Sequence, residues 1–189
     1  MKLLLPERVQ ESGQRAFLKH EARVGLRLQH PRIIRFHKFV NDRHNPFILM
    51  EFFPSQNLKL RLMRGQYETA VRPRMRMLIE QIAGALEYVH GKGWVHRDIK
   101  PDNVLVNGSG EVRLIDFALA VRSASAFVKR FFRSKRAIAG TRSYMSPEQI
   151  RGWPLDVRAD IYSLGVMLYE MAAGKLPFVG STGQDLLKK

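Results

Sequence analysis

Apolar residues recur with helical spacing in three segments of this chain, residues 15–28, 73–90 and 160–173. A spacing of three to four residues places side chains on one face of a helix, and that face packs into the core. The core candidates in the three segments are Phe17, Val24 and Leu28; then Met77, Ile79, Ile82, Ala83, Leu86 and Val89; and finally Ile161, Leu164, Val166, Leu168 and Met171. The sequence therefore predicts three helices, two of them late in the chain.

Shorter β-prone runs predict two pairs of strands. Residues 33–40 and 46–53 are separated by turn residues, and residues 104–106 and 112–115 flank the hairpin signal Asn-Gly-Ser-Gly. Strands thus cluster early in the chain and helices late, with a boundary near residues 54–57. This order predicts an α+β fold of two lobes.

Composition narrows the class of protein without naming it. The 189 residues are 45% apolar and 26% charged, which is ordinary for a globular domain. No run of some 18 apolar residues suggests a membrane span. The absence of cysteine excludes disulfides and thiolate metal sites, and fits the reducing cytoplasm, where we expect the protein to act.

The chain is strongly basic, with 32 basic and 17 acidic residues and a formal net charge of +15. Residues 117–147 contribute seven basic residues and no acidic one. The simpler explanation of this charge is a solvated basic surface that aids solubility. The more specific explanation is that the protein binds an acidic partner, such as ATP, an acidic protein substrate, a nucleic acid or an anionic lipid.

One octet, residues 96–103 with the sequence His-Arg-Asp-Ile-Lys-Pro-Asp-Asn, carries the chemistry. It places a carboxylate (Asp98), an ammonium (Lys100) and a carboxamide (Asn103) on one short turn, and Asp116 follows. Asp98 can accept the proton of an attacking hydroxyl, and Lys100 can neutralise a transferred phosphoryl group. Asn103 and Asp116 offer the oxygen ligands that Mg²⁺ prefers. The simpler alternatives are that Asp98 and Asn103 only stabilise their own turn.

The octet and the run Leu-Ile-Asp-Phe-Ala at residues 114–118 resemble the catalytic loop and the metal-binding loop of protein kinases. The sequences of these motifs are most similar to those of bacterial eukaryotic-type serine/threonine kinases. A lysine at the position of Lys100 marks the serine/threonine branch of the family. The resemblance implies an α+β, bilobal protein-kinase-like fold. It also implies transfer of the γ-phosphoryl group of ATP, with Mg²⁺, to serine or threonine hydroxyls of protein substrates. The basic charge adds the expectation that some of these substrates are acidic.

The resemblance also implies an ATP site. Lys2 and Glu21 would form the ion pair that grips the phosphates, because their spacing and the His-Pro after the first helix match the family. The adenine and ribose positions would be Met50 as gatekeeper, the backbone of Glu51 and Phe53, Leu105 as the floor, and Asn57 near the ribose. Farther along, Asp160 would tie down the backbone at residues 96–97, and Thr141 would bond near Asp98.

Three departures from the family pattern stand out. Ala118 replaces the glycine of Asp-Phe-Gly, which costs little where φ is negative. No Gly-rich loop precedes Lys2, and the chain ends where later helices would begin. We therefore expect a fold truncated at both ends, with residues 1–53 as a partial N-lobe and residues 54–189 as a partial C-lobe of a longer protein.

Two other functions compete with an active kinase. The main alternative is a kinase-like module that binds partners without catalysis, because the Gly-rich loop and the later helices are missing. The second is a protein that binds nucleic acid or lipid through residues 127–136, where aromatic and basic residues alternate. That segment is better interpreted as a regulatory loop, with Ser134 as its phosphorylation site, so nucleic acid is not the expected partner.

Overall fold

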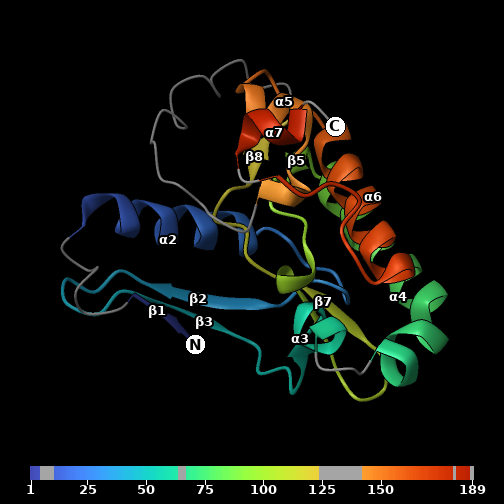
Figure 1. Ribbon diagram of the computed structural model, residues 1–189. Coiled ribbons are helices and arrows are strands. Elements are labelled where there is room, and N and C mark those ends of the chain that lie inside the picture. Colours follow the sequence, from blue (N-terminus) through green and yellow to red (C-terminus); the bar gives the residue numbers. More distant parts are fainter. Residues whose placement is uncertain (5–10, 64–66, 124–141, 181, 188–189) are drawn as a thin grey trace.

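The computed structural model describes residues 1–4, 11–63, 67–123, 142–180 and 182–187 (Figure 1). Its first sheet is antiparallel, in the order β1 (Lys2–Leu3), β3 (Phe47–Met50) and β2 (Phe36–Val40). Helix α2 (Ser12–Gly25) lies along this sheet and contacts β2 and β3. The predicted strand pair and first helix are thereby confirmed.

Helix α2 ends three residues before the predicted end of that helix, and Gly25 is its last residue. A Cβ atom on Gly25 would lie 2.6 Å from ring carbons of Phe36, so only glycine lets the end of the helix approach β2 this closely. The chain continues as a turn, and Leu28 is still buried at 2% exposure. The predicted core position is right although the helix is shorter.

Two further small sheets follow. One contains β4 (Gln56–Asn57), β6 (Val104–Val106) and β7 (Val112–Leu114), all antiparallel. The other pairs β5 (Trp94–Val95) with β8 (Val121–Arg122). The hairpin β6–β7 is the predicted one. Its turn ends at Gly110, which has a φ of 86°, a left-handed conformation that glycine adopts without strain.

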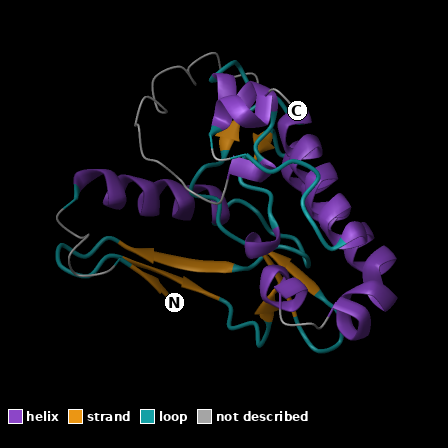
Figure 2. Cartoon of the chain, in the orientation of Figure 1, coloured by secondary structure: helices purple, strands orange, loops and turns teal. Residues whose placement is uncertain are grey.

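The remaining chain is mostly helical (Figure 2). The long helices α4 (Met75–Gly91) and α6 (Arg158–Ala173) pack side by side, and Gly174 ends α6 in the left-handed conformation. The shorter helices are α3 (Leu58–Met63), α5 (Pro147–Arg151) and α7 (Gly183–Leu187), with single turns at Tyr67–Val71, Arg72–Arg74, Pro101–Asn103 and Arg142–Tyr144.

The predicted core faces of these helices are right in most positions but wrong in three. Met77, Ala83 and Ile161 are exposed. In α4 the buried residues are Leu78, Ile82, Ala85, Leu86 and Val89. Successive helical residues turn by about 100°, so an error of one residue in the phase of the stripe moves a side chain to solvent.

Residues far apart in sequence join the first sheet to the rest. Ile33 forms a parallel bridge with Leu114, with backbone hydrogen bonds from Ile34 N to Leu114 O (3.0 Å) and from Leu114 N to Arg32 O (2.8 Å). One continuous apolar core spans both parts. The α+β class is confirmed. The division at residues 53 and 54 stays a prediction, although the change of sheet falls between β3 and β4.

None of the helices in the described residues is long and apolar enough to cross a membrane.

Candidate active site

Three side chains that the sequence singled out meet on the loop at residues 96–103. Lys100 Nζ lies 2.8 Å from Asp98 Oδ2, and Asn103 Nδ2 donates to the same oxygen and to Asp98 O, both at 2.8 Å. The Asp98 side chain is only 12% exposed. A carboxylate held from two sides has a fixed direction, which a general base needs. Because the amide nitrogen of Asn103 makes these bonds, its amide oxygen is the atom suited to a cation.

His96 links this loop to the second motif. It is fully buried, its Nδ1 accepts from Asp98 N (3.3 Å) and its Nε2 donates to Ile115 O (3.1 Å). These two bonds require the tautomer with the proton on Nε2. Asn103 O also accepts from Ile115 N at 3.0 Å. Residues 96–103 therefore lie against the strand end that leads into Asp116.

Asp160 at the start of α6 holds the same loop from behind. Its carboxylate accepts from His96 N (2.8 Å) and Arg97 N (2.7 Å), and contacts His90 Nε2 (2.8 Å). This confirms the expectation that Asp160 ties down the backbone at residues 96–97. Arg97 takes a positive φ of 71° here, and burial lowers the pKa of its guanidinium to about 10, with Asp160 opposing that shift.

Lys2 and Glu21 form the expected ion pair. Lys2 Nζ donates to both carboxylate oxygens of Glu21 at 2.8 and 2.7 Å, and lies 3.6 Å from Asp116 Oδ1. Burial alone would lower the pKa of Lys2, but the two carboxylates outweigh it and raise the pKa above its ordinary value. Burial raises the pKa of Glu21, and Lys2 only partly offsets this. One ammonium thus connects α2 with the loop that carries Asp116.

Asp116 and Ala118 have the geometry of a tight turn. Asp116 has a φ of 66°, and its Oδ1 accepts from Ala118 N at 3.3 Å. Among the described residues with side chains only Arg97 and Asp116 have positive φ, so the methyl group of Ala118 meets no backbone strain. The departure from Asp-Phe-Gly is therefore compatible with this conformation.

The donor set fits Mg²⁺. The described residues contain no group of three or more His, Asp or Glu side chains that could hold a metal by itself. Mg²⁺ in phosphoryl-transfer sites takes one or two carboxylates and completes its shell with phosphates and water. Asp116 and the amide oxygen of Asn103 supply ligands of that kind.

The residues expected to bind adenine lie where β3 leads into β4. Met50 is partly buried against the core, and Glu51 N donates to Arg35 O at 2.8 Å. Phe53 O accepts from Ser55 Oγ at 2.9 Å, and Leu105 is partly buried next to the same segment, since it pairs with Asn57.

The Asn57 side chain also caps a helix. Its Oδ1 accepts from Leu60 N at 2.8 Å, in the manner of a helix N-cap for α3. A contact to ribose could use its amide nitrogen or the second lone pair of Oδ1. Thr141 and Ser134, for which the sequence also predicts roles, lie outside the described residues.

Gln149 is a residue at this site that sequence reasoning missed. Ser146 and Gln149 form a capping box at the start of α5, and Gln149 Nε2 donates to Arg97 O at 2.8 Å. The signal was present as Ser-x-x-Gln, a helix-start pattern. The sequence pattern predicts the cap, but not the bond to the catalytic loop.

Known proteins resemble the whole chain in sequence. A family model for the protein kinase domain matches residues 1–189. The chain is 31% identical to Aurora kinase A-A of Xenopus laevis, 30% to Aurora kinase B of Danio rerio and 30% to Aurora kinase C of Mus musculus, each over 100% of the chain.

These alignments cover 44%, 56% and 65% of the three relatives, so the chain spans about half the length of the curated relatives it matches. The likeness to the bacterial branch stays a prediction. The match to the family model covers every residue, including residues 96–103 and 114–118. The chain belongs to the protein kinase domain family.

Proposed function

We propose that the protein carrying this chain transfers the γ-phosphoryl group of ATP to serine or threonine hydroxyls of protein substrates. The observation that carries the proposal is the carboxylate of Asp98, held at 2.8 Å by both Lys100 and Asn103 in a nearly buried loop. Its free lone pairs can accept the proton of a hydroxyl. Phosphoryl transfer otherwise needs positioning and neutralisation of charge, which cationic side chains and a metal provide.

The other site residues take roles around this base. Lys100 would neutralise the transferred group, and Lys2, fixed by Glu21, would bind the ATP phosphates. Asn103 and Asp116 would hold Mg²⁺, which when bound neutralises phosphate charge. The segment from Met50 to Phe53 would bind adenine above Leu105, with Asn57 toward the ribose. Residues 1–53 and 54–189 would form the two lobes around this site.

Acidic protein segments are the proposed substrates, and the cytoplasm the proposed compartment. The formal net charge of +15 supports the substrate class, because a basic surface attracts acidic partners. The contacts of Lys2 with Glu21 and of Asp98 with Lys100 and Asn103 favour catalysis over the kinase-like module without catalysis.

The test is Asp98→Asn in the full-length protein. Asparagine keeps the shape but cannot accept the proton, so transfer from radiolabelled ATP to protein should fall by about 10²-fold or more. ADP binding should remain. Asp102→Asn is the matched control, because Asp102 is exposed on the same turn and should leave turnover near the unmodified rate. Near-normal turnover of Asp98→Asn would contradict the proposal.

A further inference from the structure

Arg113 of β7 has no role in the site as described so far, yet it touches the segment proposed to bind adenine at two points. Its Nε donates to Glu51 Oε1 at 2.7 Å, and its guanidinium carbon lies 4.5 Å from the centre of the Phe53 ring. Both contacts are largely shielded from water, with the Arg113 and Glu51 side chains 18% and 23% exposed. One guanidinium thus holds both ends of residues 51–53.

The rest of the Glu51 carboxylate is also engaged. Its Oε2 accepts from Arg35 N at 3.2 Å, while Glu51 N donates to Arg35 O at 2.8 Å. Glu51 is therefore fixed to the start of β2 and to β7 at once. Its backbone direction, which the proposed adenine contact depends on, is set by these side-chain bonds.

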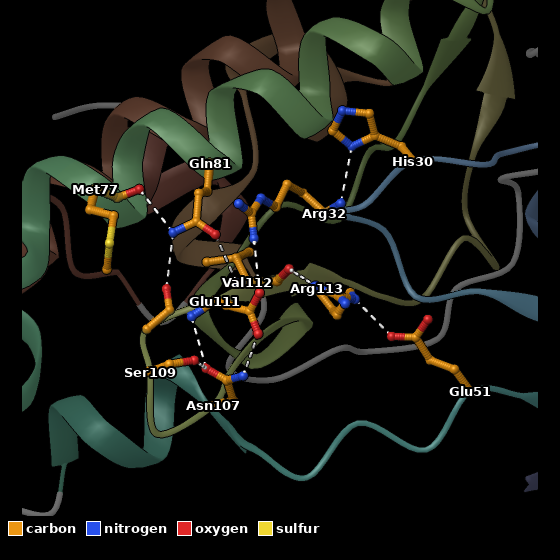
Figure 3. Close-up of polar contacts among 11 residues, drawn as sticks. His30, Arg32, Glu51, Met77, Gln81, Asn107, Ser109, Glu111, Val112 and Arg113 are labelled. Carbon is orange, nitrogen blue, oxygen red and sulfur yellow. Dashed lines mark hydrogen bonds and ion pairs between the residues drawn. The ribbon is translucent and has the colours of Figure 1, made fainter.

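Arg113 is itself anchored on the side away from Glu51. Its Nη1 donates to Val112 O (3.0 Å), Val112 N donates to Gln81 Oε1 (3.1 Å), and Gln81 Nε2 donates to Met77 O (3.2 Å). Figure 3 shows this chain of contacts running from Glu51 through Arg113 to Gln81 of α4. In the β6–β7 pair, Arg113 is also the partner of Leu105, the proposed adenine floor.

A cavity of about 300 Å³ lies beside the ion pair, with Glu51, Arg113, Arg35 and His30 in its wall. The cavity leaves room beside the pair, so a shorter or neutral side chain at position 113 would leave space and not a new packing contact. We expect residues 51–53 to loosen in such a variant.

We infer that Arg113 is a positioning residue for the nucleotide: it fixes residues 51–53 in the geometry that receives adenine, without touching the nucleotide. This rests on the proposed function of that segment. A residue of this kind sets the affinity for adenine nucleotides and leaves the phosphoryl-transfer step unchanged.

The test compares Arg113→Met with the unmodified full-length protein. Methionine keeps the apolar stem and removes the charge and the hydrogen bonds. The Kd for ADP and the KM for ATP should rise about fivefold to tenfold, since charge-assisted hydrogen bonds are lost, while kcat changes by less than about twofold. Amide hydrogen exchange at residues 51–53 should accelerate.

Two further variants separate positioning from general damage. Arg113→Lys keeps the charge but not the fork of donors, so it should rescue the ADP affinity only in part. Arg76→Met is the matched control, because Arg76 makes a similar 2.8 Å contact to Glu80 on the exposed face of α4. It should leave the ADP affinity unchanged.

A double-mutant cycle identifies the partner. If Arg113 acts through Glu51, the effects of Glu51→Gln and Arg113→Met on the Kd for ADP are not additive. Additive effects, a change in kcat without a change in KM, or unchanged exchange at residues 51–53 would each overturn the inference. If Arg113→Met does not fold, Arg113→Lys and Glu51→Gln decide the same question.

The measurements of ADP binding and of amide hydrogen exchange do not require that the protein transfer a phosphoryl group. A full-length protein that binds ADP but transfers no phosphoryl group would refute the proposed function. These two measurements would still decide the role of Arg113.

Discussion

At the scale of single residues, Asp160 shows how one buried carboxylate fixes a catalytic loop. It is fully buried and receives two backbone N–H groups at 2.7 and 2.8 Å. Hydrogen bonds to a charged acceptor are stronger than neutral ones, and leaving a buried donor unpaired is costly. The conformation of Arg97, with its positive φ, depends on this acceptor.

Replacing Asp160 by asparagine should therefore destabilise the fold. The new amide has one acceptor oxygen and turns a donor toward another donor, which should lower the free energy of unfolding by about 2–4 kcal/mol. Urea unfolding measures this, and hydrogen exchange should show faster opening at the His96 and Arg97 amides. Asp156→Asn, in the exposed pair with Arg158, serves as the control and should change neither measurement.

The residues of the site differ in how far the sequence reveals them. Asp98, Lys100 and Asn103 share one short turn, so their chemistry can be read from a local motif. Gln149 and Arg113 could not be found in this way, because their partners Arg97 and Glu51 lie 52 and 62 residues away. Long-range pairing depends on how elements pack, and one sequence gives only the local pattern of each element.

At the scale of elements, a buried cluster joins α3, α6 and the turn at Arg142–Tyr144. Lys59 Nζ lies 2.6 Å from Glu170 Oε1, and Tyr144 OH donates to Glu170 Oε2. Burial and the neighbouring Glu170 carboxylate raise the pKa of Tyr144 above its ordinary value of 10.0. The folded state therefore keeps the phenolic proton that the unfolded state loses at alkaline pH.

Because the pKa of Tyr144 is raised in the folded state, the free energy of unfolding should fall at alkaline pH. The stabilisation from Tyr144 is fully present below about pH 10 and is lost as the pH rises above it, by up to about 1.4 kcal/mol per pH unit. In Tyr144→Phe this loss should disappear, so its stability relative to the unmodified protein should improve between pH 10 and 11. Urea unfolding at each pH measures the difference.

Tyr169→Phe is the control for this experiment, because Tyr169 is 46% exposed. A slope for Tyr169→Phe equal to that for Tyr144→Phe would contradict the role assigned to the buried cluster.

The three long helices were predictable to within a few residues, since apolar spacing reveals a helix without its partners, whereas the short helices α3, α5 and α7 were not predicted. The face of each helix that is buried is harder to predict, as the exposed side chains of Met77 and Ile161 show. The period of a pattern predicts a stripe, but its phase is set by the neighbour against which the helix packs. The short strands β1, β4, β5 and β8, each two residues long, have no periodic signal at all.

At the scale of the whole molecule, the net charge of +15 predicts how substrates are chosen. An acidic peptide should be phosphorylated with a lower KM than a neutral peptide of similar sequence around the target serine. Raising the salt from about 50 to 200 mM shortens the Debye length, so the KM for the acidic peptide should rise while kcat changes little.

The neutral peptide is the control in this comparison, and its KM should respond weakly to salt. Equal salt dependence for both peptides would show that the charge serves solubility and not substrate choice.

The bridge between Ile33 and Leu114 has a consequence for how the chain folds during its synthesis. The first sheet and α2 cannot complete their core until Leu114 has left the ribosome, because residues 34–113 separate the two bridge partners. Contacts of such long separation form slowly, and the apolar face of the first sheet stays open to other chains meanwhile. We therefore expect the yield in a cell to depend on chaperones that act before β7 is translated.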